Sequence, residues 1–481
     1  MKLIDLLKNV DYKKIIGKKD INIKEIVIDS NKVVQDSLFI CIRGKDFDGH
    51  SFVKQVQTYG ATAIVCEKQL DVSVTQIIVD NSRLAMSQLA CNFYDNADKK
   101  MKIIAVVGTN GKTTTSHLIK NVLEKCSVKC GVIGTLGTYY CDKFIEPSLT
   151  TPDPMDLHKI FADMYKCGVE CVVMEVSAHA IYLDKVKNIN FFCAVFTNFS
   201  QDHLDFFDNM ENYKNAKLKF FKDNKCEHIV SNVDDSVGME IAKLYSKTIT
   251  YGMDNPADVF AINLNCKNKT TSFFINLFDQ VGQVNLNMIG FFNVYNALAC
   301  SCACYLMGVE KESIIKALST VKSVEGRLER IYSKQFDVII DYAHTPDGLT
   351  KSLLAIRPLV NNRLICIFGC GGNRDQSKRE VMGEISGSLA DFTIITSDNP
   401  RFEEPIDIMS QIEKGMLKSS KKYLLIEDRE EAIKYALDIA VKGDVLLIAG
   451  KGSEQYQEIL GIKRLYNDKD TVNECLRSMG L

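Results

Sequence analysis

The segment VVGTNGKTTTSHLI, residues 106–119, constrains this chain most, because an apolar strand runs into a glycine-containing turn and then a helix. Gly108 and Gly111 allow backbone N–H groups to turn toward a phosphate, and the helix N-terminus adds partial positive charge. Lys112 can reach the β- and γ-phosphates, and the Thr113 hydroxyl can ligate Mg²⁺. The spacing differs from G-x-x-x-x-G-K-[ST], because position 106 is Val. The unit of strand, loop and helix nevertheless predicts a site for a nucleoside triphosphate.

Length and charge limit the other classes of function. With 481 residues we expect about three domains. A formal net charge of −2 gives no electrostatic case for binding nucleic acid or an anionic membrane. No apolar run approaches the roughly 20 residues that a membrane helix requires. The first residues, MKLIDLLKNVDYKK, predict a surface helix of a cytoplasmic protein rather than a signal peptide.

The seventeen cysteines are odd in number and scattered along the chain, without the paired spacing of a zinc finger. We expect reduced thiols, mostly buried, that act as small hydrophobic side chains. Cys370 lies between glycines in FGCGG. It could be a reactive thiol, but we favour a small residue where space is tight.

Strand and helix patterns predict three α/β domains: residues 1–98, 99–325 and 326–481. Continuous apolar runs such as IIAVV and CVVMEV suit a parallel sheet covered on both faces. A patch at 259–277 alternates apolar and polar residues and predicts antiparallel strands. Strands alternate with helices from 336 onward, which predicts a doubly wound, Rossmann-like domain. The polar stretch 95–102 is the first predicted linker.

Polar residues cluster where the central strands end. MEVSAHAI, 174–181, carries Glu175 and Ser177, and FTNFSQDHLDFF, 196–207, carries Asp202 and His203. A carboxylate at the end of a neighbouring parallel strand is where a phosphate-loop protein holds magnesium. The following segment YKNAKLKFF, 213–221, by itself indicates only a solvated lysine face.

The third domain has four such loops, DYAHTPD (341–347), FGCGGNRDQSKR (368–379), SDNPRFEEP (397–405) and AGKGSEQYQ (449–457). Each follows a predicted strand, at the edge where doubly wound sheets bind ligands. Their arginines suit a carboxylate or phosphate ligand, because a guanidinium pairs with either in a bidentate way.

These motifs, in this order, resemble the Mur ligase family over essentially the whole chain. The likeness is greatest to its tripeptide-synthetase type, which adds the third amino acid of the peptidoglycan stem. VIDSNKV, SLFICIRG and DGHSF match its UDP-binding domain. TTPDP, EVSAH, YKNAK, GFFNVYNALA, VEGRLE, GCGGNRD, DNPR and GKGSE match its later motifs.

The resemblance implies a role for each matching residue. ATP would be held by Gly108, Thr109, Asn110, Gly111, Lys112, Thr113 and Thr114, with Asn293 and Asn296 near the adenine and Arg327 and Asp341 contacting the nucleotide. Mg²⁺ would be bound by Thr113, Glu175, His203 and Lys217, the last as a carbamylated lysine (N6-carboxylysine). The UDP-sugar would contact Ser30, Thr150, Thr151, Ser177 and Lys185. The incoming amino acid would contact Arg374, Asp398, Asn399, Pro400, Arg401, Gly450 and Glu454.

Four positions depart from the family pattern. Asn31 stands where arginine is usual, Ala178 where serine is usual, and Ser453 where histidine is usual. Lys185 keeps the charge of the usual arginine but loses its bidentate fork. None of these positions belongs to the phosphate loop or to the implied metal ligands.

The implied reaction is ATP-dependent amide formation through an acyl phosphate, on UDP-MurNAc-L-Ala-D-Glu, by a cytoplasmic monomer. The intact DNPR motif indicates meso-diaminopimelate as the added amino acid, because Arg401 can pair with its second carboxylate. The alternatives are the same ligase adding L-lysine, another amide ligase such as folylpolyglutamate synthetase or a MurF-like enzyme, a phosphate-loop switch or motor, and a non-catalytic homologue.

Overall fold

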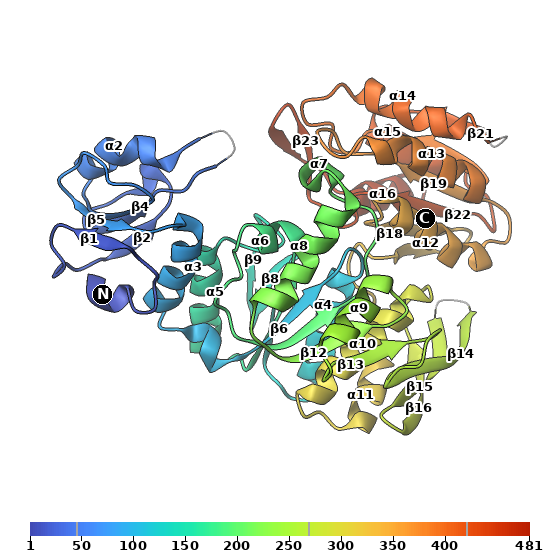
Figure 1. Ribbon diagram of the computed structural model, residues 1–481. Helices are drawn as coiled ribbons and strands as arrows, with labels where there is room; N and C mark the ends of the chain where they lie inside the picture. Colours follow the sequence, from blue (N-terminus) through green and yellow to red (C-terminus); the bar gives the residue numbers. More distant parts are fainter. Residues whose placement is uncertain (45–46, 268–269, 420–421) are drawn as a thin grey trace. The chain divides into compact units, whose positions relative to one another are not determined.

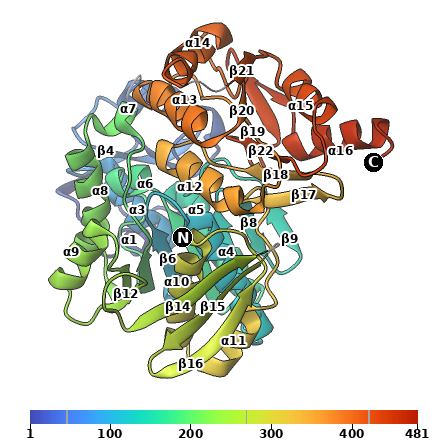
Figure 2. The same cartoon turned by 90° about the vertical axis from the view of Figure 1, so that its right-hand side faces the viewer.

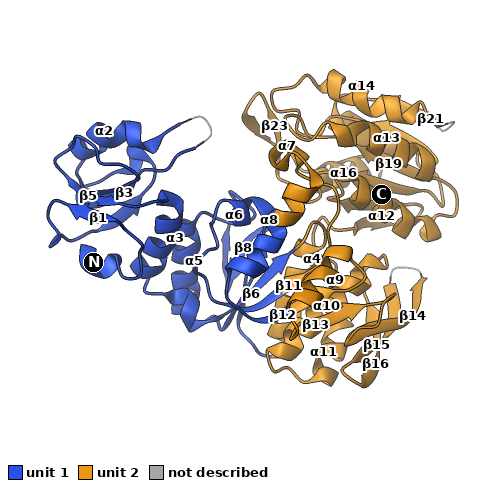
Figure 3. Ribbon diagram, in the orientation of Figure 1, with its two compact units in different colours: residues 1–107, 127–194, 216–229 blue, residues 108–126, 195–215, 230–481 orange. Residues whose placement is uncertain are grey.

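The computed structural model describes residues 1–44, 47–267, 270–419 and 422–481 (Figure 1). The chain divides into two compact units (Figure 3). Unit 1 consists of residues 1–107, 127–194 and 216–229, and unit 2 of residues 108–126, 195–215 and 230–481. The chain passes from one unit to the other several times in its middle part, inside strands β11 (Phe191–Phe196) and β12 (Cys226–Asn232) and inside helix α8 (Met210–Asp223).

Unit 1 begins with a five-stranded sheet in the order β1-β5-β4-β3-β2. Its pairs are parallel except β1–β5. Apolar side chains of helices α1 and α3 cover one face of this sheet, and those of α2 cover the other. The elements are α1 (Leu3–Leu6), β1 (Lys14–Ile16), β2 (Glu25–Val27), η1 (Ser30–Lys32), β3 (Ser37–Ile40), η2 (Gly49–Phe52), α2 (Val53–Thr58), β4 (Ala61–Cys66), β5 (Thr75–Ile78) and α3 (Ser82–Phe93).

The predicted N-terminal surface helix is wrong in extent. Only Leu3–Leu6 is helical, and Leu3 and Leu6 are buried in the core of this sheet rather than lying on a surface. The predicted linker 95–102 also contains structure, because it holds the short helix η3 (Ala97–Lys100), in which Ala97 and Asp98 are buried.

The second part of unit 1 is a mixed sheet section in the order β6-β10-β7-β8-β9. Strands β6, β10 and β7 are parallel and almost wholly buried, as their continuous apolar runs predict. The antiparallel hairpin of β8, which is mostly buried, and β9, which is exposed, was not predicted from the sequence. The elements are β6 (Lys102–Val107), β7 (Cys130–Gly134), β8 (Gly137–Tyr140), β9 (Lys143–Ile145), α5 (Pro154–Lys166), β10 (Cys171–Val176) and α6 (Ala178–Tyr182).

Unit 2 starts with the helix that follows the phosphate loop, α4 (Lys112–Lys125), which packs on α10 (Phe292–Leu306). Strands β12, β13 and β14 are parallel, and β14, β15 and β16 form an antiparallel ladder, as predicted for 259–277. The remaining elements are α7 (Leu204–Phe207), α9 (Ser236–Leu244), β13 (Ile249–Gly252), β14 (Val259–Lys267), β15 (Thr270–Leu277), β16 (Gln280–Leu286) and α11 (Lys311–Leu318).

The C-terminal sheet of unit 2 has the order β17-β18-β22-β19-β20-β21, parallel except for β17–β18. Successive residues of β19 face opposite cores, because Leu364, Cys366 and Phe368 pack with α12, α13 and α14 while Ile365 and Ile367 pack with α15 and α16. Figure 2 shows these helices on the two sides of the sheet. This arrangement confirms the doubly wound prediction.

The elements of this last part are β17 (Glu329–Ser333), β18 (Asp337–Asp341), α12 (Pro346–Ile356), η4 (Arg357–Leu359), β19 (Leu364–Phe368), α13 (Ser377–Leu389), β20 (Phe392–Ile395), α14 (Pro405–Met416), β21 (Lys422–Leu425), α15 (Arg429–Asp438), β22 (Val445–Ala449), β23 (Tyr456–Ile459), β24 (Ile462–Leu465) and α16 (Asp468–Ser478). Among the described residues, no helix has the length and apolarity needed to cross a bilayer.

All seventeen cysteines lie in described residues and are free thiols, most of them buried. Cys370 is buried beside Met382, and burial raises the pKa of its thiol to about 11. A reactive cysteine needs an accessible thiolate. The interpretation of Cys370 as a small buried residue is therefore supported.

Candidate active site

The phosphate loop of unit 2 is shaped by two glycines with positive φ. Gly108 has φ +155° and Gly111 has φ +82°. A Cβ atom added to Gly108 would lie 1.9 Å from Thr197 Oγ1, and one added to Gly111 would lie 2.5 Å from Asn296 Oδ1. Gly111 is also the N-cap of α4 and has no side chain that could accept from the first helical turn. The loop therefore directs helix N–H groups outward, as anion binding requires.

Asn198 holds the tip of this loop in place. Its side chain accepts a hydrogen bond from Asn110 N and donates one to Asn110 O, both at 2.9 Å. Its backbone carbonyl accepts from Thr109 N at 2.8 Å, and Thr197 Oγ1 donates to Asn110 O at 2.7 Å. Asn198 lies in the predicted strand-end segment 196–207, but this role was not predicted for it.

Lys112 lies across the loop. Its Nζ donates to Gly108 O at 3.0 Å and to Thr109 O at 2.8 Å. The cation is thus held over the backbone groups that form the predicted phosphate site.

Residues of the C-terminal sheet reach the same loop within unit 2. Arg327 Nη2 donates to Thr113 Oγ1 at 2.9 Å, and its guanidinium lies over the ring of Tyr342. Asp341 is buried and accepts from Leu328 N and Ser352 Oγ, and burial raises the pKa of its carboxyl. Arg327 therefore lies beside a phosphate-loop side chain, and Asp341 anchors the backbone next to Arg327.

Asn296 and Asn293 form a buried pair beside the loop. Asn296 Oδ1 accepts from Thr115 Oγ1 at 3.2 Å, and its Nδ2 donates to Asn293 Oδ1 at 2.9 Å. The structure thus brings Asn296 against Gly111 and α4. The predicted contact of these residues with adenine stays a prediction.

His203 belongs to a charge cluster around the buried carboxylate of Asp202. His203 Nε2 lies 3.3 Å and His344 Nε2 3.8 Å from Asp202 Oδ2. Burial by itself raises the pKa of Asp202, but His203, His344 and Lys378 outweigh burial and hold that pKa below its usual range. Asp202 is therefore a carboxylate at neutral pH, and it orients His203.

Unit 1 holds a second network, centred on Glu175 at the end of β10. The Glu175 side chain is 1% exposed; Oε1 accepts from Thr135 N at 2.9 Å and Oε2 from Thr135 Oγ1 at 3.1 Å. Thr150 Oγ1 lies 3.2 Å from Thr135 Oγ1, and Thr151 Oγ1 donates to Glu175 O at 2.9 Å. Ser177 N in turn donates to Thr151 Oγ1 at 3.1 Å. The structure therefore gathers most of the residues predicted to contact the UDP-sugar around a buried carboxylate.

The other two residues predicted to contact the UDP-sugar are Lys185 and Ser30. Lys185 is buried and pairs with Asp153 at 2.8 Å, just before α5. Ser30 begins η1, where Asp29 accepts a hydrogen bond from Asn31 N. The backbone N–H of Asn31 thus helps to cap the short helix η1.

In α8, Lys217 is 2% exposed, whereas Lys214 and Lys219 are partly exposed and ion-paired. Lys214 pairs with Glu240 at 3.2 Å and Lys219 with Asp184 at 2.8 Å. The prediction of a solvated lysine face therefore applies to Lys214 and Lys219 but not to Lys217.

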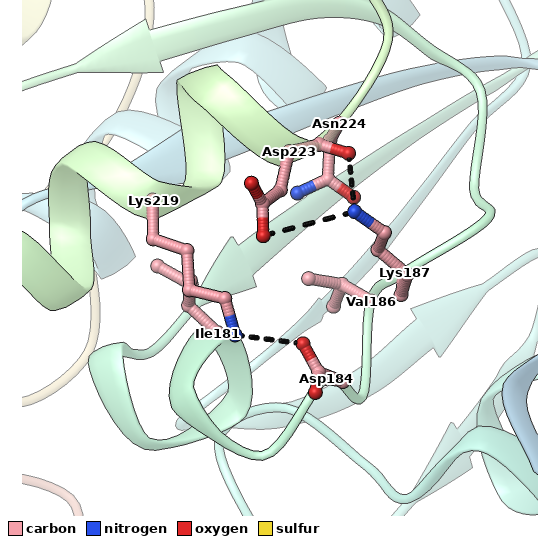
Figure 4. Close-up of a pocket in the computed structure, with 7 residues that line it drawn as sticks. All are labelled: Ile181, Asp184, Val186, Lys187, Lys219, Asp223 and Asn224. Carbon is pink, nitrogen blue, oxygen red and sulfur yellow. Dashed lines mark hydrogen bonds and ion pairs between the residues drawn. The ribbon is translucent and has the colours of Figure 1, made fainter. Parts of the chain in front are cut away.

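A small pocket borders the same helix (Figure 4). Lys219 Nζ donates to Asp184 there, and Lys187 Nζ donates to Asp223 O at 2.8 Å. Because both cations have oxygen partners inside the pocket, we assign it no part in the reaction.

The predicted amino-acid site lies at one edge of the C-terminal sheet. Asn399 Nδ2 donates to Glu454 Oε2 at 2.9 Å, and Lys451 Nζ donates to Asn399 Oδ1 at 3.0 Å and to Glu454 Oε2 at 3.1 Å. Gly450, with φ +116°, lies so close to Asp398 that an added Cβ would be 2.6 Å from its Oδ2. Lys451, which is fully buried, is a residue of this network that the sequence analysis missed.

Arg401 and Arg374 extend from this edge. Arg401 Nη1 donates to Gly372 O at 2.8 Å, and its Nε lies 3.3 Å from Glu458 Oε2. Arg374 Nη1 lies 3.8 Å from Asp205 Oδ2. The side chain of Arg374 is about half exposed, so it can meet a ligand.

The whole chain matches known proteins. Successive stretches match the models of the Mur ligase catalytic domain family (22–94), the Mur ligase middle domain (106–304) and the Mur ligase glutamate ligase domain (326–452). The chain is 42% identical over 486 residues to UDP-N-acetylmuramoyl-L-alanyl-D-glutamate–2,6-diaminopimelate ligase 1 of Clostridium acetobutylicum, with 100% of both chains covered. The chain belongs to the Mur ligase family.

Other Mur ligases extend the comparison. The chain is 42% identical over 490 residues to the diaminopimelate ligase of Alkaliphilus metalliredigens, covering 100% of this chain and 99% of the other. A solved structure of such a ligase is 29% identical, with a TM-score of 0.69 over 95% of this chain and 96% of that one. The MurF ligase of Thermotoga maritima, solved with ADP, shares the fold at 22% identity and a TM-score of 0.66, with 94% and 97% covered. The three-domain α/β fold is thereby confirmed, whereas the domain limits at 98 and 325 stay predictions.

The close packing of the Mur ligase phosphate loop gives a testable prediction. Gly108→Ala places a methyl group against Thr197, and overpacking of this kind costs about 1–3 kcal/mol. ATP affinity, measured by calorimetric titration, should fall about 10-fold or more.

Gly308→Ala is the matched control for this change. Gly308 also has a positive φ, +89°, but no described atom lies within 4 Å of its added Cβ. It should reduce stability without changing ATP affinity. Equal ATP affinity in the two variants would contradict the packing argument.

Proposed function

We propose that this chain is the ATP-dependent ligase that joins 2,6-diaminopimelate, in its meso form, to UDP-N-acetylmuramoyl-L-alanyl-D-glutamate in peptidoglycan precursor synthesis. The observation that carries the proposal is the intact Asp398-Asn399-Pro400-Arg401 loop, which is tied through Asn399 to Glu454 and Lys451. Full-length similarity to diaminopimelate ligases supports the same conclusion.

The proposed reaction has two steps. The D-glutamyl carboxylate attacks the γ-phosphate of ATP, which forms an acyl phosphate and releases ADP. The amine of diaminopimelate then attacks the acyl carbon, a C–N bond forms, and inorganic phosphate leaves. Lys112 and the N–H groups at the start of α4 would stabilise the negative charge that develops on the phosphoryl oxygens.

The donors in the chain fit Mg²⁺. Glu175 is a buried carboxylate that accepts from the Thr135 hydroxyl, and Thr113 offers a hydroxyl at the start of α4. Both supply the hard oxygen donors that Mg²⁺ prefers. We propose Thr113, Glu175, His203 and carbamylated Lys217 as the metal-binding set. Bound Mg²⁺ would neutralise charge on the transferring phosphate.

The charged side chains of the proposed amino-acid site would select diaminopimelate over lysine. Arg401 and Arg374 supply guanidinium groups at one sheet edge, and Glu454 supplies a carboxylate for the ammonium group of an amino acid. Diaminopimelate carries one more carboxylate than lysine. A site built for that group disfavours a ligand that lacks it, because the guanidinium is then desolvated without a partner.

The buried state of Lys217 predicts a covalent modification. In buffer with carbon-13 bicarbonate, the wild-type chain should show a carbamate NMR signal. Burial disfavours the ammonium form of Lys217, and the neutral amine can add CO₂ with loss of a proton to give a metal-binding anion. Lys217→Gln should remove that signal and lower kcat about 10- to 100-fold or more, as loss of a group that supports the metal does.

Lys219→Gln is the control, because Lys219 lies on the same helix but is 36% exposed and paired with Asp184. It should keep both the signal and the activity. A wild-type chain without the signal, or a fully active Lys217→Gln variant, would show that Lys217 has no such role.

An isotope experiment tests the reaction itself. The UDP-linked dipeptide is labelled with oxygen-18 in its D-glutamyl carboxylate and incubated with ATP and diaminopimelate. An acyl phosphate intermediate transfers one labelled oxygen to each phosphate released. Unlabelled phosphate without a tripeptide product, as expected of a nucleotide-driven switch, would overturn the proposal.

A further inference from the structure

Three potential metal ligands from different helices converge in unit 1, outside the candidate active site. Cys91 lies near the end of α3, Asp98 in η3 and His158 in α5, and their donor atoms lie within 4.8 Å of one another. Cys91 Sγ donates to Asp98 Oδ1 at 3.4 Å, and His158 Nδ1 lies 3.8 Å from the same oxygen. Relative exposures of 0%, 1% and 0% exclude these side chains from solvent.

This cluster contains polar atoms that the described residues leave without partners. In the described part of the chain, neither ring nitrogen of His158 has a hydrogen-bond partner. Asp98 Oδ2 has none either. Burying such groups without partners is costly, and native structures rarely do so unless a ligand satisfies them. Two orphaned side chains that share one site therefore indicate a bound ligand.

We propose that Cys91, Asp98 and His158 bind one structural Zn²⁺. Thiolate, carboxylate and imidazole are the usual protein ligands of zinc. A thiolate and a carboxylate together neutralise the charge of a divalent ion, which suits a fully buried site. The thiolate donor of Cys91 disfavours Mg²⁺, which takes hard oxygen ligands.

Protonation and coordination are consistent with zinc. Both ring nitrogens of His158 lack hydrogen-bond partners among the described residues, so either can ligate the ion. Because zinc binds the thiolate form of cysteine, metal binding would release the thiol proton of Cys91. Asn96 Oδ1, which lies 3.4 Å from Cys91 Sγ and also accepts from Lys99 Nζ, or a water molecule, would complete four-coordination.

The proposed ion would fasten the connection between two substructures of unit 1. Its ligands join α3, which covers the N-terminal sheet, with η3 and α5. His158 lies one turn into α5, and the loop directly before α5 carries Thr150 and Thr151. The ion would thus hold the helix that follows the proposed UDP-sugar loop.

Metal analysis of the full-length chain tests this inference without reference to ligase activity. After equilibration with Zn²⁺ and removal of free metal, the wild-type chain should retain one zinc ion. With Co²⁺ it should show a thiolate-to-cobalt charge-transfer band. Zinc should raise the Tm of the wild-type chain, and a chelator should reverse the rise.

The variants Cys91→Ala and Asp98→Asn should each lose the retained zinc, and the first should also lose the cobalt band. Asp98→Asn nearly keeps the shape of the side chain, which limits any loss of folding. Cys171→Ala, which alters another fully buried cysteine of unit 1, is the matched control and should keep both signals. A wild-type chain that retains no zinc, or variants that retain it as well as wild type, would overturn the proposal.

Discussion

Lys112→Met is expected to lower kcat for tripeptide formation about 100- to 1,000-fold, the usual effect of removing a group that stabilises transition-state charge. Lys112 Nζ lies over the phosphate loop, bonded to Gly108 O and Thr109 O, and no other lysine starts α4. Initial rates of ADP release and product formation, measured with saturating substrates, give the comparison.

Lys120→Met is the matched control for Lys112. Lys120 lies on the same helix and pairs with Glu124 at 2.6 Å, away from the loop. Its loss should change kcat less than about twofold, since exposed ion pairs on a helix contribute little. Similar losses of activity in the two variants would contradict the role given to Lys112.

Arg401→Met is expected to lower kcat/KM for meso-diaminopimelate about 10- to 150-fold, since a hydrogen bond to a charged group contributes about 1.5–3 kcal/mol. Turnover of L-lysine should change little, because lysine has no second carboxylate. The ratio of the two kcat/KM values is the decisive measurement.

This ratio separates recognition from a structural role. Arg401 also donates to Gly372 O, so its loss could disturb the loop and lower activity with both amino acids. Arg477→Met, an exposed position in α16, should leave both values unchanged. An equal fall for diaminopimelate and lysine would refute Arg401 as the group that reads the second carboxylate.

The sequence predicts the buried parallel strands well, because a strand covered on both faces must be apolar throughout. Strands β6 and β10 fall where IIAVV and CVVMEV predict them. The hairpin of β23 and β24 was missed, since its residues are partly or wholly exposed and carry no continuous apolar signal. The N-terminal helix was predicted too long, because helical spacing of apolar residues also occurs in a short turn packed on a sheet.

The candidate site was predictable where chemistry depends on adjacent residues, as in the phosphate loop and the DNPR motif. It was not predictable where function depends on tertiary hydrogen bonds. Thr135 holds Glu175, Asn198 holds the loop tip, and Lys451 joins Asn399 to Glu454. Each of these residues is unremarkable in its own stretch of sequence.

A competition reaction tests the central claim most directly. The wild-type chain is given ATP, UDP-MurNAc-L-Ala-D-Glu and equal concentrations of meso-diaminopimelate and L-lysine, and the products are separated by mass. We expect the diaminopimelate product to dominate and to appear with one ADP per molecule formed. A dominant lysine product would contradict the role of Arg401, and ATP hydrolysis without either product would contradict the ligase assignment.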